Sequence, residues 1–190
     1  IVVNLPQIKM FDCDKYKKIR DFVEKKSEKT KIIAISKYQK TEDVSKAVSL
    51  GVDIFGENRV QEAKQKFTQI LKKKRIELHL TGPLQTNKVK EALNIFNVFH
   101  TLDREKLLRE FAKYPNIIKT KSFFIQVNTG KEISKSGVFP EDVLKFYNLC
   151  KDYGITNIEG LMCIPPINEN PKKHFSLLNQ ISREVGNGHL

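Results

Sequence analysis

Ile32-Ile33-Ala34-Ile35-Ser36-Lys37 is the stretch that decides the fold of this chain. Its four apolar residues in a row, three of them isoleucines, are typical of a parallel strand that is buried on both faces. Thr41 is expected to cap the helix that follows, with Glu42 and Asp43 in its first turn, and Gly51 is expected to end it. A strand joined to a helix by a short loop is the building unit of parallel α/β proteins.

The same unit recurs along the chain at intervals of roughly 20 to 30 residues. An opening helix is expected at residues 16–26, ahead of the strand at 32–36. Further strands are predicted at residues 52–55, 76–80, 98–102, 123–127 and 158–164. Helices are predicted at residues 41–50, 60–73, 104–113, 140–153 and 173–184, and one more begins after Thr86. No low-complexity linker separates these elements, so residues 1–190 are predicted to form a single domain.

Six such units fit either a doubly wound sheet or part of a closed barrel. A doubly wound dinucleotide-binding sheet carries G-x-G-x-x-G after its first strand, whereas this chain has the glycine-free Ser36-Lys37-Tyr38-Gln39-Lys40. No G-x-x-x-x-G-K-[ST] motif for nucleotide phosphates is present either. A full (β/α)₈ barrel takes about 250 residues, so 190 residues hold about six units. The sequence therefore favours a TIM-type (β/α) barrel.

The composition limits the classes of protein to which the chain can belong. The formal net charge is +12, but the basic residues are dispersed, and the run at residues 72–75 (KKKR) is interpreted as a solvated helix end rather than a nucleic-acid patch. No apolar run approaches the ~20 residues of a membrane span, and residues 1–6 lack a basic signal-peptide region. Cys13, Cys150 and Cys163 lie far apart, which indicates inert, largely buried thiols in a reducing cytoplasm and no metal site.

Lys37 is the nucleophile candidate among the strand ends, where functional residues of barrels lie. Alternation places Ile33, Ile35 and Lys37 on one side of the strand. If that side faces the barrel axis, the amine is partly desolvated, which favours the neutral form that attacks an aldehyde to give a Schiff base. The carbonyl partner is either pyridoxal 5′-phosphate (PLP) or a substrate, as in a lysine-dependent aldolase. The alternative is an ordinary exposed lysine.

Other polar residues at strand ends have structural alternatives. Asn58 can hydrogen-bond a ring oxygen or an imine of a ligand, or it can cap the next helix. His79 and His100 are expected to pack rather than to catalyse. The pair Asp103-Arg104 is expected to form a helix cap and a surface ion pair.

Six segments in chain order resemble the pyridoxal phosphate homeostasis family. They are residues 33–37 (IAISK), 55–62 (FGENRVQE), 79–90 (HLTGPLQTNKVK), 100–104 (HTLDR), 125–137 (IQVNTGKEISKSG) and 160–164 (GLMCI). The resemblance implies a fold type III PLP-binding barrel related to the N-terminal domain of alanine racemases. It also implies PLP on Lys37, a place in the cofactor pocket for Asn58, and a role in PLP homeostasis without established turnover.

Three departures from the family pattern stand out. Pro83 takes the place of the usual histidine, and Arg59 that of the common tyrosine. The family continues beyond Gly188-His189-Leu190 with two more strands, which carry phosphate-binding backbone groups and an arginine that faces the pyridine nitrogen. Residues 1–190 are therefore expected to form a barrel without its last two strands, as a subset of a longer protein.

The sequence leaves four functional hypotheses. The first is a monomeric, cytoplasmic PLP-binding protein that handles PLP and related B6 vitamers, with PLP-dependent apoenzymes as further partners and no nucleic acid or membrane. The second is a PLP-dependent enzyme like alanine racemase. Such an enzyme requires a second, β-rich domain that supplies a catalytic tyrosine, and residues 1–190 do not contain one. The third is a nucleic-acid-binding module, and the fourth is a Schiff-base aldolase. No catalytic and no metal-binding residue is assigned.

Overall fold

The structure is a computed structural model that describes residues 2–4 and 11–186. The chain divides into two compact units, residues 1–79 and 80–190, and each is described by itself. The prediction of a single domain over residues 1–190 stays a prediction. The chain end at Gly188-His189-Leu190, on which the comparison with longer family members rests, lies outside the described residues, as do Ile1, Leu5 and Pro6 of the expected N-terminal segment.

Parallel strands form the sheet of the first unit. They are β1 (Val2–Asn4), β2 (Ile33–Ile35) and β3 (Ile54–Glu57). Val3 of β1 pairs with Ala34, and Ala34 pairs with Phe55 of β3. β4 (Glu77–Leu80) begins beside β3, where Glu77 N donates to Asp53 O at 2.8 Å. β1 was not predicted from the sequence, because three residues are too few to establish a periodic pattern.

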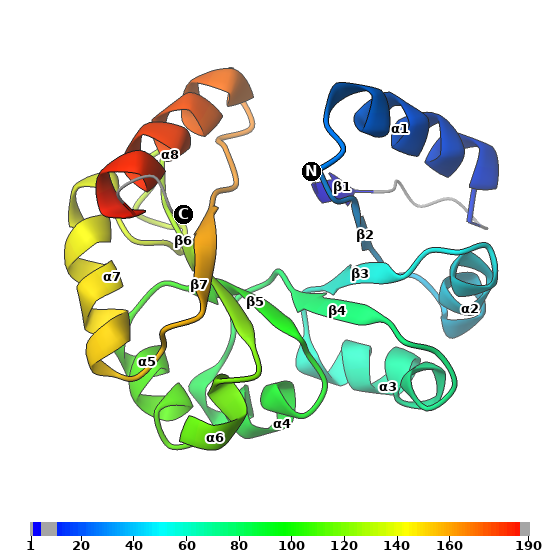
Figure 1. The fold of residues 1–190 in the computed structure, drawn as a ribbon, viewed down its shortest axis with the longest axis horizontal. Helices are drawn as coiled ribbons and strands as arrows, with labels where there is room; N and C mark the ends of the chain where they lie inside the picture. The colour runs from blue at the N-terminus through cyan, green and yellow to red at the C-terminus, as the bar shows by residue number, and fades with distance from the viewer. Residues whose placement is uncertain (1, 5–10, 187–190) are drawn as a thin grey trace. The chain divides into compact units, whose positions relative to one another are not determined.

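Three helices lie on the outer side of these strands (Figure 1). They are α1 (Cys13–Lys26), α2 (Thr41–Ser49) and α3 (Val60–Leu71). Gly51 has a φ of 92° and ends α2 as predicted. The prediction that Thr41 is the cap is wrong, because Lys40 still has extended backbone and Thr41 is already helical.

The second unit repeats the pattern with β5 (Val98–Leu102), β6 (Ser122–Gln126) and β7 (Ile158–Met162), again in parallel. Its core contains a cluster of fully buried aromatic rings. Phe99 of β5 lies 5.4 Å from Phe123 of β6 and 5.2 Å from Phe111, between ring centroids. These rings join the two strands to the helix that carries Phe111, so one face of the strand pair is sealed by aromatic packing.

The helical segments of the second unit differ from the predicted ones mainly at their ends. They are η1 (Thr86–Lys88), α4 (Val89–Leu93), α5 (Glu105–Phe111), α6 (Pro115–Ile118), η2 (Pro140–Asp142), α7 (Val143–Asp152) and α8 (Pro171–Gly186). Asp103 does not cap α5 as predicted, because Arg104 is the extended N-cap residue. Asp103 instead forms the predicted ion pair, 2.5 Å from Arg104 Nη1, but the prediction that it lies on the surface is wrong for Asp103, whose side chain is 5% exposed.

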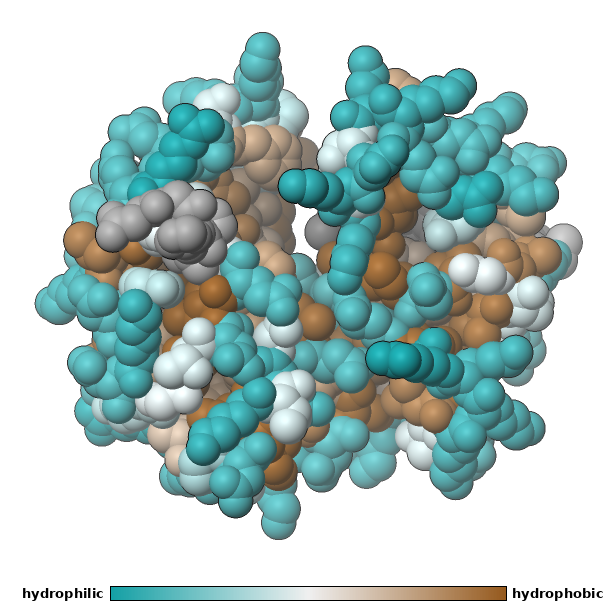
Figure 2. Space-filling view, viewed as in Figure 1, coloured by the Kyte–Doolittle hydropathy of each residue, from teal (hydrophilic) through white to brown (hydrophobic). Residues whose placement is uncertain are grey.

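Hydrophilic side chains cover most of the visible outer surface of both units (Figure 2). Residues 72–75 follow the end of α3 and are exposed, as expected for a solvated helix end. Within the described part of the chain, no helix has the length and hydropathy to span a bilayer. Residues 2–4 and 11–186 also contain no group of three or more His, Cys, Asp or Glu side chains that could bind a metal ion.

Candidate functional site

A tight turn at the carboxyl end of β2 presents Lys37. The pairing with β3 extends one residue past the strand, since Ser36 N donates to Gly56 O at 2.9 Å. Gln39 N then donates to Ser36 O at 3.1 Å, which closes a four-residue turn with Lys37 and Tyr38 at its centre. Tyr38 adopts a φ of 65°, in the left-handed region. Lys37 therefore stands on a defined turn rather than in an open loop.

The register between β2 and β3 relates Lys37 to Asn58. Ile35 of β2 pairs with Gly56 of β3. Lys37 and Asn58 each follow two residues later, so they occupy matching positions at the same edge of the sheet. Lys37 and Asn58 themselves lie just past the strands, in a turn and a bend.

The opposite face of these strands is covered by α3. The ring centroid of Phe55 on β3 lies 5.4 Å from that of Phe67 on α3. Ser36 and Glu57 share this helix-covered face, since Ser36 Oγ donates to Glu57 Oε1 at 2.8 Å and both are buried. Within the strands, alternation turns the paired positions of Ile35 and Gly56, two residues before Lys37 and Asn58, away from α3.

In the part of the chain that the structure describes, Lys37 contacts its neighbour Tyr38. Its side chain is half-buried, and Nζ lies 5.9 Å from the centroid of the Tyr38 ring. Among the residues that the structure describes, Nζ has no hydrogen bond or ion pair. A half-buried lysine that is not held by a carboxylate is able to react with a carbonyl group.

Asn58 is also half-buried, and it does not cap the next helix. The N-cap residue of α3 is Arg59, which makes no side-chain cap hydrogen bond. Asn58 is therefore not the N-cap residue of α3. Arg59, at the position of the family's common tyrosine, points to solvent with 71% of its side chain exposed.

A buried charged cluster lies directly behind the turn. Lys66 of α3 donates from Nζ to Glu57 Oε1 at 2.8 Å and to the backbone oxygen of Ser36, also at 2.8 Å. The Lys66 side chain is 9% exposed and that of Glu57 is 0% exposed. Burial raises the pKa of Glu57 above its ordinary value of 4.5, although hydrogen bonds from Lys66 and Ser36 act in the opposite direction.

Lys66 was not singled out from the sequence, although a signal was available. Val60, Ala63 and Phe67 form the apolar stripe of α3, and all three are buried. Lys66 lies within that stripe, three residues after Ala63. A lysine on the apolar face of an amphipathic helix must reach a buried acceptor, which here is the carboxylate at the end of β3.

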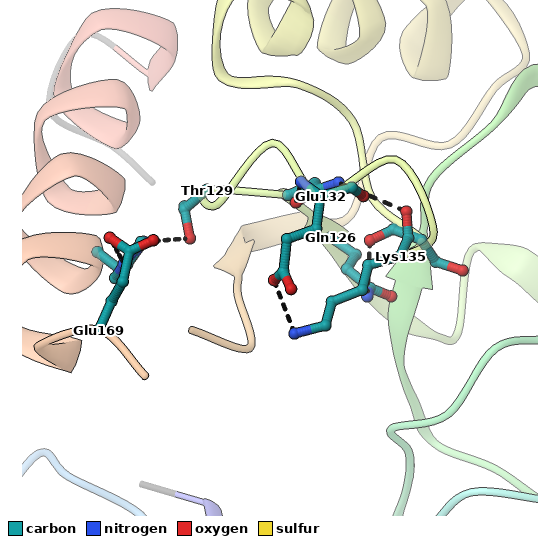
Figure 3. A network of polar contacts seen from close by, with 8 residues as sticks. Gln126, Thr129, Glu132, Lys135 and Glu169 are labelled. Atoms are coloured by element: carbon teal, nitrogen blue, oxygen red, sulfur yellow. Dashed lines mark hydrogen bonds and ion pairs between the residues drawn. The ribbon is translucent and has the colours of Figure 1, made fainter. Parts of the chain in front are cut away.

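The loop after β6 forms a second ordered region, in the other unit (Figure 3). Asn128 is buried, and its Nδ2 donates to Glu132 O at 2.8 Å while its Oδ1 accepts from Glu132 N at 3.2 Å. Its backbone N donates to Val138 O at 2.8 Å. Gly137 has a φ of 121°, and a β-carbon on it would lie 2.7 Å from Asn128 N. The asparagine and the glycine together hold this loop in shape.

The same loop is linked to α8. His174, which is 2% exposed, places Nδ1 2.9 Å from Thr129 Oγ1 and Nε2 3.2 Å from Glu169 Oε2. Burial raises the pKa of the Cys163 thiol, with a smaller lowering effect from Thr129. Burial also raises the pKa of Cys150 to about 12. The prediction of buried thiols is thus confirmed for these two cysteines, whereas Cys13 is partly exposed.

His79 and His100 pack, as predicted. His79 is 5% exposed, with Nε2 2.9 Å from Glu77 Oε1. His100 is 6% exposed and stacks on Phe124 with ring centroids 4.5 Å apart.

Relatives of known name match most of the chain. The family model described as alanine racemase, N-terminal domain, matches residues 14–184. A pyridoxal phosphate homeostasis protein of Aquifex aeolicus is 32% identical over 185 residues, which cover 91% of this chain and 80% of the relative. A protein of the same name from Buchnera aphidicola is 32% identical, with 88% of this chain and 78% of the relative covered.

Solved structures show the fold. The structure of PipY from Synechococcus elongatus with PLP bound has a TM-score of 0.75 at 23% identity, covering 93% of this chain and 82% of that one. Alanine racemase from Acinetobacter baumannii has a TM-score of 0.69 at 12% identity, covering 93% of this chain and 50% of that one. The predicted α/β fold of the alanine racemase barrel type is thereby confirmed. The chain belongs to the alanine racemase N-terminal domain family and, within it, to the pyridoxal phosphate homeostasis proteins.

Proposed function

We propose that this chain is a single-domain PLP-binding protein that takes part in PLP homeostasis and holds the cofactor as a Schiff base on Lys37. The observation that carries the proposal is the half-buried Lys37 on the turn after β2, with Asn58 in register at the end of β3. Relatives at 32% identity are named pyridoxal phosphate homeostasis proteins, and PipY has been solved with PLP bound.

The residues present fit an aldehyde cofactor. PLP supplies an aldehyde carbon, which the neutral Lys37 amine attacks; a C=N bond forms and the aldehyde oxygen leaves as water. Lys37 must give up one proton from its ammonium form before it attacks. The Asn58 amide both donates and accepts hydrogen bonds, so it suits an oxygen on the cofactor ring beside the new bond.

The protein stores and hands on the cofactor rather than turning over a substrate. This part of the proposal is supported by its relatives, which carry the name of homeostasis proteins. We place the protein in the cytoplasm as a monomer, with B6 vitamers and PLP-dependent apoenzymes as its partners. The free thiols of Cys13, Cys150 and Cys163 agree with a reducing compartment.

The test is a visible absorbance titration with PLP, followed by borohydride reduction and peptide mass mapping. The wild type is expected to give a Schiff-base band that disappears on reduction, with the pyridoxyl mass on Lys37. Lys37→Ala is expected to lose the band. The matched control is Lys40→Ala, which replaces an exposed lysine that makes no side-chain cap bond at α2.

Three results would contradict the proposal. An unchanged band and affinity in Lys37→Ala, or label scattered over surface lysines, would remove the assignment of the cofactor lysine. Racemisation of alanine above the level of the Lys37→Ala protein would show that the chain is an enzyme.

A further inference from the structure

The backbone oxygen of Ser36 accepts two hydrogen bonds. It accepts from Gln39 N at 3.1 Å, within the turn, and from Lys66 Nζ at 2.8 Å, from α3. A carbonyl oxygen has two lone pairs, so both are engaged. This carbonyl belongs to the peptide unit that joins Ser36 to Lys37. The ammonium of Lys66 is therefore bonded to the peptide unit from which Lys37 extends.

Lys66 is itself held in place from more than one side. Glu57 Oε1 lies 2.8 Å from its Nζ, and Glu62 Oε2 lies 3.7 Å away. Ser36 Oγ donates to the same Glu57 oxygen at 2.8 Å. Ser36, Glu57 and Lys66 thus form a closed ring of contacts, in which the carboxylate accepts from one residue on the strand end and one on the helix.

A buried ion pair of this kind needs a reason beyond stability. The desolvation of two charges offsets much of their attraction, so such pairs are often replaceable by apolar residues without loss of stability. Ser36 and Glu57 lie on the helix-covered face. The described contact that links the charged cluster to Lys37 is the one from Lys66 to the backbone oxygen of Ser36.

We propose that Lys66 is a positioning residue for Lys37, which sets the direction of the Lys37 side chain by clamping the Ser36 carbonyl to α3 with the help of Glu57. The inference rests on the proposed function of Lys37. Rotation of the Ser36–Lys37 peptide would break a charge-assisted hydrogen bond in a dry site, which is unfavourable. The amine is thereby preorganised, so less conformational freedom is lost when it meets a carbonyl carbon.

The first variant is Lys66→Met, with Lys64→Met as its matched control. Lys64 is on the same helix and exposed, so both variants remove one lysine charge, but only one removes the contact with Ser36. In the PLP-free Lys66→Met protein, the Gln39 amide is expected to exchange with solvent faster, because its acceptor is no longer clamped. The dissociation constant for PLP is expected to rise by about tenfold or more. Lys64→Met should leave both quantities unchanged.

The second variant is the double change Glu57→Gln/Lys66→Met, which removes the buried carboxylate that the single change leaves uncompensated. A merely structural role of Lys66 predicts that this protein regains stability and PLP affinity together. The positioning role predicts that stability returns while fast Gln39 exchange and weak PLP binding remain. Recovery of wild-type PLP affinity in the double variant would overturn the inference, as would wild-type exchange and affinity in Lys66→Met.

Failure of the inference and failure of the proposed function give different results. If Lys37 does not bind PLP, Lys37→Ala and the wild type bind alike, but Gln39 exchange in the PLP-free proteins still reports on the clamp. If Lys37 binds PLP and Lys66 is irrelevant, Lys37→Ala loses the absorbance band while Lys66→Met keeps wild-type affinity and exchange.

Discussion

Two polar networks stand just beyond strand ends, and they are built in opposite ways. Behind the turn after β2, Glu57 and Lys66 form a buried ion pair between a strand and a helix. In the loop after β6, the buried Asn128 holds its own loop with uncharged hydrogen bonds to the backbone of Glu132. The ion pair links segments that are distant in sequence, whereas the amide shapes a single segment.

The two networks differ in how much stability the protein loses when one residue of the network is replaced. A buried charge without its partner is far more unfavourable than an amide replaced by a methyl group, because ions lose more hydration energy on burial. The charged network therefore holds its geometry strongly but depends on both partners. The uncharged network tolerates single losses better, and part of its shape comes from backbone conformation at Gly137.

The largest expected loss of stability comes from a substitution in the charged network. Lys66→Met should lower the free energy of unfolding by about 3–5 kcal/mol, because Glu57 stays buried without its ammonium partner. Asn128→Ala should lower it by about 1–3 kcal/mol. Urea denaturation of both variants beside the wild type measures the difference. Equal losses of unfolding free energy in the two variants would show that the charged network is no more sensitive to a single replacement than the uncharged one.

The second effect concerns the backbone of the loop after β6. Gly137→Ala should lower the free energy of unfolding by about 2–4 kcal/mol, because a β-carbon would lie 2.7 Å from Asn128 N at a φ of 121°. Gly51→Ala is the matched control, since Gly51 has a φ of 92° and no heavy atom within 4 Å of the added carbon. Gly51→Ala should lose about 1–2 kcal/mol, from backbone strain alone. Thermal unfolding of both variants compares them, and a smaller loss for Gly137→Ala would refute the steric argument.

The smallest effect is a pH dependence that belongs to the charged network. The pKa of Glu57 is raised above 4.5 in the folded protein, chiefly by burial. The folded state then holds this proton more tightly than the unfolded state, so its contribution to stability is complete below 4.5 and is lost as the pH rises through the folded pKa. The wild type should therefore lose stability relative to Glu57→Gln over this window, by at most about 1.4 kcal/mol for each pH unit.

The measurement is urea denaturation of the wild type and Glu57→Gln at a series of pH values from 4 upward. Asn128→Ala serves as the control, because it leaves the Glu57 carboxylate in place and should keep the wild-type slope. A rise in the stability of the wild type relative to Glu57→Gln with increasing pH would mean that the pair with Lys66 outweighs burial.

Much of the candidate site was predictable from local patterns. Lys37 and Asn58 were identified because each follows a short apolar strand, and the parallel register then brings matching positions to one edge of the sheet. Gly51 was identified as a helix end, and it has a positive φ. These features depend on residues close together in the chain, so periodicity and turn chemistry are enough to find them.

Other features of the structure could not be predicted from local sequence patterns. Thr41 and Asp103 were expected to be N-cap residues, but the N-cap residue of α2 is Lys40, one residue before Thr41, and that of α5 is Arg104, one residue after Asp103. His174 carried no local signal, because its partner Thr129 lies 45 residues earlier. Tertiary packing decides which residues become partners of this kind, and local propensity does not encode that packing.

The sequence by itself determined the alternation of strands and helices, the barrel family and the position of Lys37 at a strand end, because these follow from periodicity and from motifs of a few residues. Only the tertiary structure decided that Lys66 of α3 meets Glu57 and the carbonyl of Ser36, 30 residues away along the chain. The physical reason is that a buried ammonium must find acceptors in space. Which acceptors it finds depends on strand register and on which face of the sheet the helix covers.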